Sequence, residues 1–301
     1  MWPLSRFEGC LLGAALGDAL GAPFEGSGPG PKDLRPLRRR EVLSWTDDTQ
    51  MSIAVARALL EASQEVPGPQ AFAQSYVRHF EPSRGYGAGA TRTLGLLAQG
   101  MPAEEASRAV FPEGSAGNGA AMRAAPIGLC YHHDLGLLEQ AVRNASVPTH
   151  PHPLGVEGAR LQALAVALVL RGQDVLSGLL GAVRQRDFQQ RLRLLKAFIQ
   201  AGAEPFGTAS QLGTGILALE SVPTALYAFL RFAQEGYMKV VEFCLYLGGD
   251  TDTLASMAGA LAGTALGREG LPEEYLSRLE ARRELQALAQ ALCLRCAPGR
   301  P

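Results

Sequence analysis

The sequence predicts an all-α protein, a compact bundle of helices, and three observations support this. Apolar residues recur at spacings of i, i+3 and i+4 along most of the 301 residues, which is the pattern of helices with one buried face. No convincing run of alternating β-branched residues occurs, so strands are not expected. The hydrophobic content of 47% and the mean hydropathy of +0.03 are typical of a folded, well-buried protein.

The expected helices follow one another along most of the chain. They cover residues 5–21, 48–63, 69–80, 88–99, 102–110, 119–131, 134–146, 155–170, 173–184, 187–201, 214–233, 237–247, 251–267 and 272–293. Pro223 is expected to kink or reset its helix, because proline has no N–H and clashes with the preceding turn. Residues 22–44 are rich in Pro, Gly and Arg and lack periodicity, so they predict a long loop of the kind that often forms a lid.

Glycine recurs every fourth residue in the first expected helix and again near residue 260. The two sets are Gly9, Gly13, Gly17 and Gly21, and Gly259, Gly263 and Gly267. This spacing places each set on one helix face. Because glycine is a poor helix former, the stripes indicate close packing against a neighbour, the other striped helix being one candidate. Dimerisation within a membrane is the alternative, and it is disfavoured because the apolar segments are short.

Size, charge and cysteine content set the broad class. We expect residues 1–301 to form one domain, because no linker-like stretch divides them, with about 294–301 as a disordered tail. The net charge of -1 and the pI near 6.5 give no basic field for nucleic acid or an acidic membrane, so neither partner is expected. The five cysteines, an odd number, predict free thiols and a reducing cytoplasm rather than a disulfide framework.

Two acidic clusters, each at the start of a helix, are the main chemical signal. They are Trp45-Thr46-Asp47-Asp48-Thr49 and Gly248-Gly249-Asp250-Thr251-Asp252-Thr253. Helix capping would explain one aspartate in each cluster. Four crowded aspartates need a cation or strong hydrogen bonds to remain ionised. If the clusters meet in space, their hard oxygen ligands suit Mg²⁺, Mn²⁺ or Ca²⁺. Asp18 is expected to cap a helix or to form hydrogen bonds inside the core.

Two glycine-rich loops also precede expected helices. They are Gly85-Tyr86-Gly87-Ala88-Gly89 and Gly114-Ser115-Ala116-Gly117-Asn118-Gly119. Convergent backbone N–H groups at a helix N-terminus can hold phosphate, although such loops are also ordinary turns. His150 lies in a Thr-His-Pro-His-Pro stretch with no further zinc ligands at suitable spacing. It is therefore expected to hydrogen-bond a ligand or the backbone.

Taken in order, these motifs resemble the ADP-ribosylglycohydrolase family, which includes dinitrogenase-reductase-activating glycohydrolases and ADP-ribosyl-acceptor hydrolases. The segments that carry the resemblance are residues 17–25, 45–49, 117–123, 149–150 and 248–253. They run from the first helix into the last third, so the resemblance covers nearly the whole chain. Residues 85–89 and 219–225 look closer to the branch that cleaves serine-linked and poly-ADP-ribose than to the arginine-specific branch.

The resemblance implies an orthogonal helical bundle with a binuclear Mg²⁺ centre, Mn²⁺ being possible. It assigns the metal ligands to Thr46, Asp47, Asp48, Asp250, Asp252 and Thr253. It places Glu25 on a mobile flap as the acid or base, and we count Asp47 and Asp48 with it as catalytic. The diphosphate would be held by Gly85, Tyr86, Gly87, Ala88, Gly89, Ser115, Ala116, Gly117, Asn118 and Gly119. His150 would contact the ribose nearest the scissile bond.

One departure concerns the adenine end of the site. The resembled branch has an aromatic residue where this chain has Ala116, and Phe111 stands one residue closer to the loop than the family's phenylalanine. Adenine stacking and affinity for polymer are therefore expected to be weaker.

The resulting expectation is a monomeric, Mg²⁺-dependent hydrolase that releases ADP-ribose from an acceptor. The acceptor would be a protein side chain, with a serine-type O-linkage favoured, or an O-acyl group or poly-ADP-ribose, so the partner is an ADP-ribosylated protein or small conjugate. Three alternatives remain: an arginine-linkage hydrolase, a non-catalytic ADP-ribose-binding protein, and a phosphohydrolase that cuts the diphosphate and releases AMP.

Overall fold

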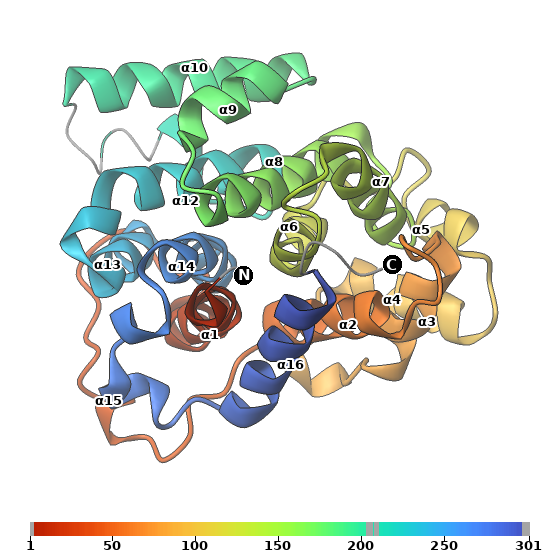
Figure 1. Ribbon diagram of the computed structural model, residues 1–301, viewed down its shortest axis with the longest axis horizontal. Helices are drawn as coiled ribbons and strands as arrows, with labels where there is room; N and C mark the ends of the chain where they lie inside the picture. The colour runs from red at the N-terminus through yellow and green to blue at the C-terminus, as the bar shows by residue number, and fades with distance from the viewer. Residues whose placement is uncertain (1–2, 203–206, 208–210, 297–301) are drawn as a thin grey trace.

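The two glycine-striped helices, α1 (Leu4–Gly21) and α14 (Thr251–Leu266), pack against each other at the centre of the computed structural model (Figure 1). An ideal Cβ atom at Gly263 would lie 1.9 Å from the carbonyl oxygen of Gly9, and one at Gly13 would lie 2.5 Å from that of Gly259. The backbones are therefore in direct contact, and each stripe is the packing surface of the other. The prediction that the stripes mark close helix packing is confirmed, with the other stripe as the neighbour.

The pairing is antiparallel, and this determines where the acidic residues lie. Gly9 faces Gly263, whereas Gly21, at the other end of α1, faces Asp252 at the start of α14. The Thr251 hydroxyl donates a hydrogen bond of 2.9 Å to the Gly21 carbonyl. The end of α1, which one 3₁₀ turn separates from Glu25, is thus held against the second acidic cluster.

Substituting Gly263 with alanine is expected to destabilise the protein. The added methyl group would overlap the Gly9 carbonyl, and overpacking of this kind costs about 1–3 kcal/mol, more than the gain of about 1 kcal/mol in helix propensity. Gly95, inside α4 (Ala88–Ala98), is a matched control because its Cβ would meet no atom within 4 Å. Urea unfolding should show a lower midpoint for Gly263→Ala and an equal or higher one for Gly95→Ala. Equal stability of the two variants would contradict the packing argument.

The structure describes residues 3–202, 207 and 211–296, and within them it is all-α, as predicted. That part has no strand, only isolated bridges between Leu43 and Leu279 and between Gly117 and Leu217. The remaining α-helices are α2 (Asp47–Glu61), α3 (Pro69–Arg78), α5 (Ala103–Val110), α6 (Ala125–Cys130), α7 (Leu135–Ser146), α8 (Pro153–Leu170), α9 (Val175–Ala182), α10 (Arg186–Ala201), α12 (Ala218–Phe232), α13 (Tyr237–Leu247), α15 (Glu273–Leu276) and α16 (Arg282–Arg295).

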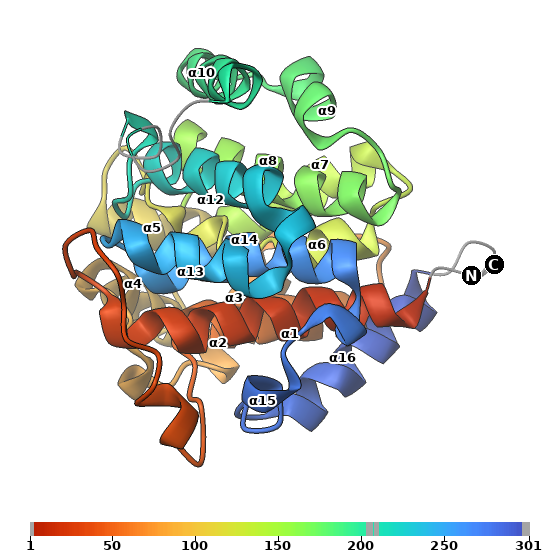
Figure 2. The same cartoon turned by 90° about the vertical axis from the view of Figure 1, so that its left-hand side faces the viewer.

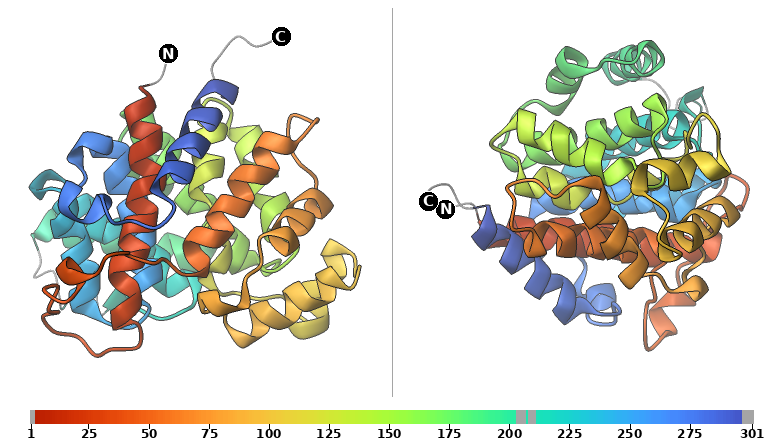
Figure 3. Two further views of the ribbon diagram at one scale, coloured as in Figure 1. Left: turned by 90° about the horizontal axis from the view of Figure 1, so that it is seen from below. Right: turned by 90° about the vertical axis from the view of Figure 1, so that its right-hand side faces the viewer.

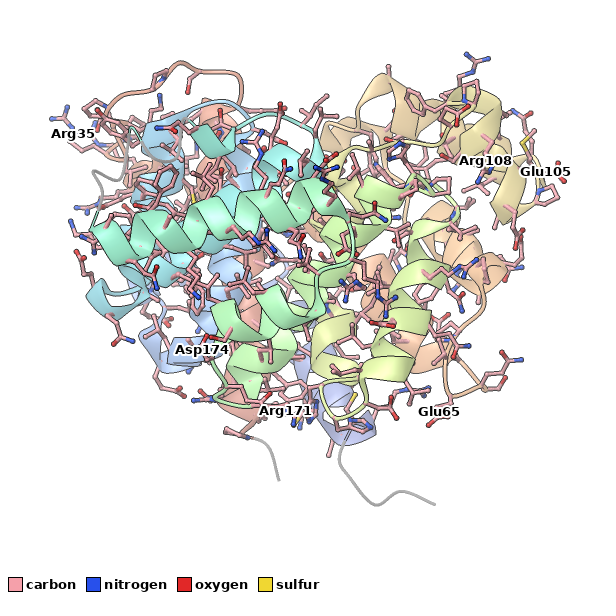
Figure 4. All side chains as sticks on the ribbon, turned by 90° about the horizontal axis from the view of Figure 1, so that it is seen from above. Arg35, Glu65, Glu105, Arg108, Arg171 and Asp174 are labelled. Carbon is pink, nitrogen blue, oxygen red and sulfur yellow. The ribbon has the colours of Figure 1, made fainter. Side chains whose placement is uncertain are left out.

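The helices lie in layers on both sides of the central pair (Figure 2). Helices α9 and α10 are outermost on one side, with α8 and α12 beneath them, while α15 and α16 cover α1 on the other side. The start of α1 and the end of α16 emerge on the same side of the molecule (Figure 3). Charged side chains of both signs project from the periphery, including Arg35, Glu105 and Arg171 (Figure 4).

Among the described residues, α8 is the helix long and apolar enough to cross a membrane by length and composition. Inside the molecule, 83% of it is buried, packed against α6, α7, α12 and α14. Its apolar character is accounted for by its position as a core helix.

The main differences from the expected helices lie at three places. The helix expected over 272–293 is interrupted, because Leu43 pairs with residues 278–280 and Ala281 takes a left-handed backbone with φ of 54°. The helix expected over 119–131 begins only at Ala125, after a 3₁₀ turn and a second turn. Pro223 lies inside α12 without ending it, so the predicted reset is wrong.

The ends of the long loop and of the chain complete the comparison. Residues 22–44 form a loop as predicted, with two short 3₁₀ turns, Ala22–Phe24 and Leu37–Arg39. The last helix reaches Arg295, so residues 294 and 295 are helical, while 297–301 of the expected disordered tail lie outside the described residues.

Candidate metal and substrate site

Asp18 of α1 fixes the first acidic cluster in place. Its buried carboxylate accepts hydrogen bonds from the backbone N–H groups of Thr46 and Thr49 at 3.0 Å and from their hydroxyls at 2.9 and 2.6 Å. The N-terminus of α2 is therefore tied to α1. Burial raises the pKa of Asp18 to about 6, although these hydrogen bonds act in the opposite direction. The expectation that Asp18 hydrogen-bonds inside the core is confirmed.

The two acidic clusters, some two hundred residues apart in sequence, meet at the ends of α2 and α14. The Thr253 hydroxyl lies 3.3 Å from Oδ1 of Asp48 and donates to it. Asp48 and Asp252 are only 2% and 5% exposed, and Oδ2 of Asp48 has no hydrogen-bond partner in the described part of the chain. An orphaned, buried carboxylate oxygen at this point indicates a missing cationic or hydrogen-donating partner.

Electrostatics lead to the same conclusion. Burial, followed by the charges of neighbouring acids, raises the pKa of Asp47 to about 7 and that of Asp252 to about 9, and raises the pKa of Asp48 well above its usual range. No lysine or arginine among the described residues forms an ion pair with these groups. Crowded carboxylates without a cationic side chain fit a hard divalent cation such as Mg²⁺ or Mn²⁺.

Glu25 belongs to the same group of acids. One carboxylate oxygen from each of Glu25, Asp250 and Asp252 can be chosen so that all lie within 4.8 Å of one another. Partial burial, and then the charge of Asp250, raise the pKa of Glu25. Its side chain is otherwise exposed to the cleft. The position is compatible with contact to a metal ion and with proton transfer at a bound substrate.

The backbone after Glu25 is paired to the second acidic cluster. Gly26 donates a 2.8 Å hydrogen bond to the Gly249 carbonyl, and Gly249 returns one of 2.9 Å to Ser27. Gly248 must be glycine, because its φ is +72° and a Cβ atom would lie 2.2 Å from the Ser27 carbonyl oxygen. Gly248 thus allows the Glu25 loop to approach the second acidic cluster.

A cleft of about 270 Å³ joins the acids to both glycine loops and to His150. The predicted site residues that line it are Glu25, Thr46, Asp47, Asp48, Gly85, Tyr86, Gly87, Gly89, Ser115, Gly117, Asn118, Gly119, His150, Asp250, Asp252 and Thr253. Ala88 and Ala116 lie within the two glycine loops, next to residues that line the cleft, but do not line it themselves. Phe111, which is 40% exposed, borders the cleft and packs its ring against Gly89.

Asn118 connects the second glycine loop to the second acidic cluster. Its side-chain amide donates a hydrogen bond of 2.6 Å to Oδ2 of Asp250. We predicted Asn118 as a substrate-binding residue, and in this structure the amide contacts an acid. The loop and the acids are therefore one connected unit.

Sequence reasoning did not single out Arg84, which braces the first glycine loop. Its guanidinium stacks 3.8 Å from the centroid of the Trp45 ring, donates to the Trp45 carbonyl at 3.1 Å, and pairs with Glu280 at 2.6 Å. Arg84 directly precedes Gly85, and Trp45 directly precedes Thr46. Arg84 thus connects the first glycine loop to the first acidic cluster. Its partners Trp45 and Glu280 are distant in sequence, so no local spacing of residues indicates these contacts.

Replacing Arg84 with methionine is expected to destabilise the protein by about 1–3 kcal/mol, because the partly buried Glu280 loses its partner. ADP-ribose binding should weaken several-fold, because the first glycine loop loses its brace. Arg78→Met is the matched control, since Arg78 pairs with Glu61 on the open surface, where an ion pair contributes about 0–1 kcal/mol. Urea unfolding and calorimetric titration with ADP-ribose measure both effects. Similar behaviour of the two variants would argue against the brace.

The fold and the site together define a class of protein. Its members are all-α, and the N-termini of their helices bring several carboxylates together in a cleft whose walls contain glycine-rich loops. A model of the ADP-ribosylglycohydrolase family matches residues 3–301. The chain therefore belongs to the ADP-ribosylglycohydrolase family.

Individual relatives agree with this assignment. The chain is 37% identical to ADP-ribosylhydrolase ARH3 of Gallus gallus, covering 96% of this chain and 93% of the relative, and 36% identical to ADP-ribosylhydrolase ARH3 of Homo sapiens, with 96% and 93% covered. A solved structure described as an ADP-ribosylglycohydrolase-related protein complex superimposes with a TM-score of 0.75 at 27% identity, covering 97% of this chain and 98% of the other. The chain is a hydrolase that acts on ADP-ribosyl linkages.

Proposed function

We propose that this hydrolase uses two Mg²⁺ ions to cleave the bond between C1″ of ADP-ribose and an oxygen of its acceptor, with a serine side chain as the favoured acceptor, and that it releases free ADP-ribose. The observation that carries the proposal is the meeting of both acidic clusters and Glu25 in one cleft with two glycine loops. The branch-like segments at residues 85–89 and 219–225 support the serine-type linkage.

The position of each residue in the cleft suggests its role in the reaction. Thr46, Asp47, Asp48, Asp250, Asp252 and Thr253 would hold the ions. Bound Mg²⁺ supplies charge that orients ribose hydroxyls, polarises the leaving oxygen and favours ionised water. Glu25 lies at the edge of this cluster, where its carboxyl group can protonate the leaving oxygen and then accept a proton from water.

The rest of the cleft fits the remainder of ADP-ribose. Backbone N–H groups of the two glycine loops would hold the diphosphate. His150 would contact the distal ribose. Ala116 leaves one side of the adenine end without an aromatic residue, so mono-ADP-ribosylated proteins and small conjugates are better substrates in this proposal than polymer. We further propose a monomer without nucleic-acid or membrane partners that works in the reducing cytoplasm, which the odd number of cysteines supports.

Mass spectrometry on matched ADP-ribosyl peptides tests the reaction and the linkage. Serine-linked and arginine-linked peptides of one sequence are incubated with the protein in Mg²⁺ and in EDTA. The proposal expects free ADP-ribose from the serine-linked peptide only, abolished by EDTA. Release from the arginine-linked peptide would reassign the acceptor. Release of AMP would move the scissile bond to the diphosphate.

A further inference from the structure

A buried arginine in the wall of the cleft has no acidic partner in the described part of the chain. Arg123 is 2% exposed, and its guanidinium stacks 4.3 Å from the centroid of the Tyr76 ring. One guanidinium nitrogen, Nη2, donates to the Ala145 carbonyl at 3.0 Å and to Oγ1 of Thr149 at 2.6 Å. Buried cations are normally paired with a carboxylate, so the position of this one calls for a reason.

Thr149 lies between Arg123 and His150. Its Oγ1 is 2.8 Å from Nδ1 of His150. A guanidinium group has only donors, so the Thr149 oxygen must accept from Arg123. The hydroxyl proton then has one acceptor among the described residues, Nδ1 of His150. The opposite arrangement, with Nδ1–H as donor, would leave a buried hydroxyl proton without an acceptor.

We infer that Arg123 and Thr149 form a positioning relay that holds His150 as the neutral Nε2–H tautomer, with Nε2 as a hydrogen-bond donor to the ligand in the cleft. Nε2 faces the second glycine loop, where an ideal Cβ would lie 2.8 Å from it at Gly119 and 3.4 Å at Gly117. No group in the described part of the chain accepts a hydrogen bond from Nε2. The choice of acceptor, a hydroxyl or phosphate oxygen of ADP-ribose, rests on the proposed function.

The cation has a consequence that a carboxylate partner would not have. A carboxylate next to an imidazole stabilises its protonated form. Here burial, and then the charge of Arg123, lower the pKa of His150 to about 3. His150 is thus a neutral hydrogen-bond donor at physiological pH and has no extra proton to transfer. Proton transfer to the leaving group is left to Glu25.

Nuclear magnetic resonance of the protein with ¹⁵N-labelled histidine tests the relay, because ring nitrogens with and without hydrogen have widely separated ¹⁵N shifts. His150→Gln identifies the His150 signals among the five histidines. We expect Nε2–H in the wild type and in Thr149→Ser, which keeps the hydroxyl. Thr149→Val removes it at nearly constant shape and should lose this tautomer preference. Its Kd for ADP-ribose should rise about 2- to 12-fold, the loss of one hydrogen bond.

Ser107→Ala is the matched control. The Ser107 hydroxyl donates to the backbone carbonyl of Thr149 at 2.6 Å, so this variant disturbs the same segment but not the relay. An Nδ1–H tautomer in the wild type, or an unchanged tautomer in Thr149→Val, would overturn the inference. Wild-type protein with the expected tautomer and no affinity for ADP-ribose would support the relay and count against the proposed substrate.

Discussion

Replacing Glu25 with glutamine is expected to lower turnover by about 10²- to 10⁴-fold while leaving the affinity for Mg²⁺ and ADP-ribose largely intact. General acid–base catalysis contributes a factor of this size. Glutamine preserves the shape and a hydrogen-bonding oxygen but has no transferable proton. The carboxyl group lies beside Asp250 and Asp252, where the acceptor oxygen and water would meet the metal centre.

Single-turnover kinetics with an ADP-ribosyl peptide, together with calorimetric titration of ADP-ribose, separate the chemical step from binding. Glu41→Gln is the matched control, because Glu41 is exposed in the same long loop and does not line the cleft. If Glu25→Gln turns over as fast as Glu41→Gln, Glu25 has no part in proton transfer. If Glu25→Gln binds Mg²⁺ at least tenfold more weakly, Glu25 is primarily a metal ligand.

Local patterns carried most of the fold. Helical periodicity placed most helices within a few residues of their observed bounds. The glycine stripes indicated the contact between α1 and α14, because two helix backbones can approach as closely as Gly9 and Gly263 do only where neither residue has a side chain. The break near Ala281 was missed for the opposite reason. Neither glycine nor proline marks it, and the left-handed residue directly follows the segment that pairs with Leu43, more than two hundred residues away in sequence.

The candidate site divides in the same way. The acids and glycine loops were found because their chemistry is concentrated in short stretches. Arg84 and Arg123 were not singled out for a role, because each acts through partners distant in sequence, Glu280 for the first and Tyr76 and Thr149 for the second. A lone arginine in a sequence carries no sign of its partner. Such bracing residues are accessible only once the fold is known.

The crowded acids predict opposite effects of one substitution on stability and on function. Asp252→Asn should weaken Mg²⁺ binding and turnover by about 100-fold or more, because removal even of a supporting group around a metal costs 10- to 100-fold. The same variant, free of metal, should be more stable than the wild type near pH 8. Asparagine removes a buried carboxyl group that has no cationic side-chain partner and that, in the metal-free protein, must take up a proton well above its ordinary pKa or be buried as an uncompensated charge.

The pH dependence has a definite sign. The folded-state pKa of Asp252, about 9, lies far above its value of about 3.9 in an unfolded chain, so the metal-free native state binds more protons than the unfolded state between these limits. The stability of the metal-free wild type must therefore fall as pH rises from about 4 towards 9. Asp47, with a pKa of about 7, adds to this fall in the lower part of the window. Mg²⁺ should reverse the trend, since it binds the ionised acids and releases their protons.

Urea unfolding of the wild type and Asp252→Asn at pH 5, 6, 7 and 8, each with EDTA or with Mg²⁺, measures all of these effects in one series. Asp187→Asn, on the exposed surface of α10, is the control for loss of a charge as such. In EDTA the wild type should lose stability with rising pH and the Asp252 variant should lose less. In Mg²⁺ the order should invert, because the wild type binds the ion more tightly and gains more stability from it. A wild type whose stability in EDTA does not fall between pH 5 and 8 would mean that the acids are neutralised by something other than a metal, and the assignment of this cleft as a metal centre would fail with it.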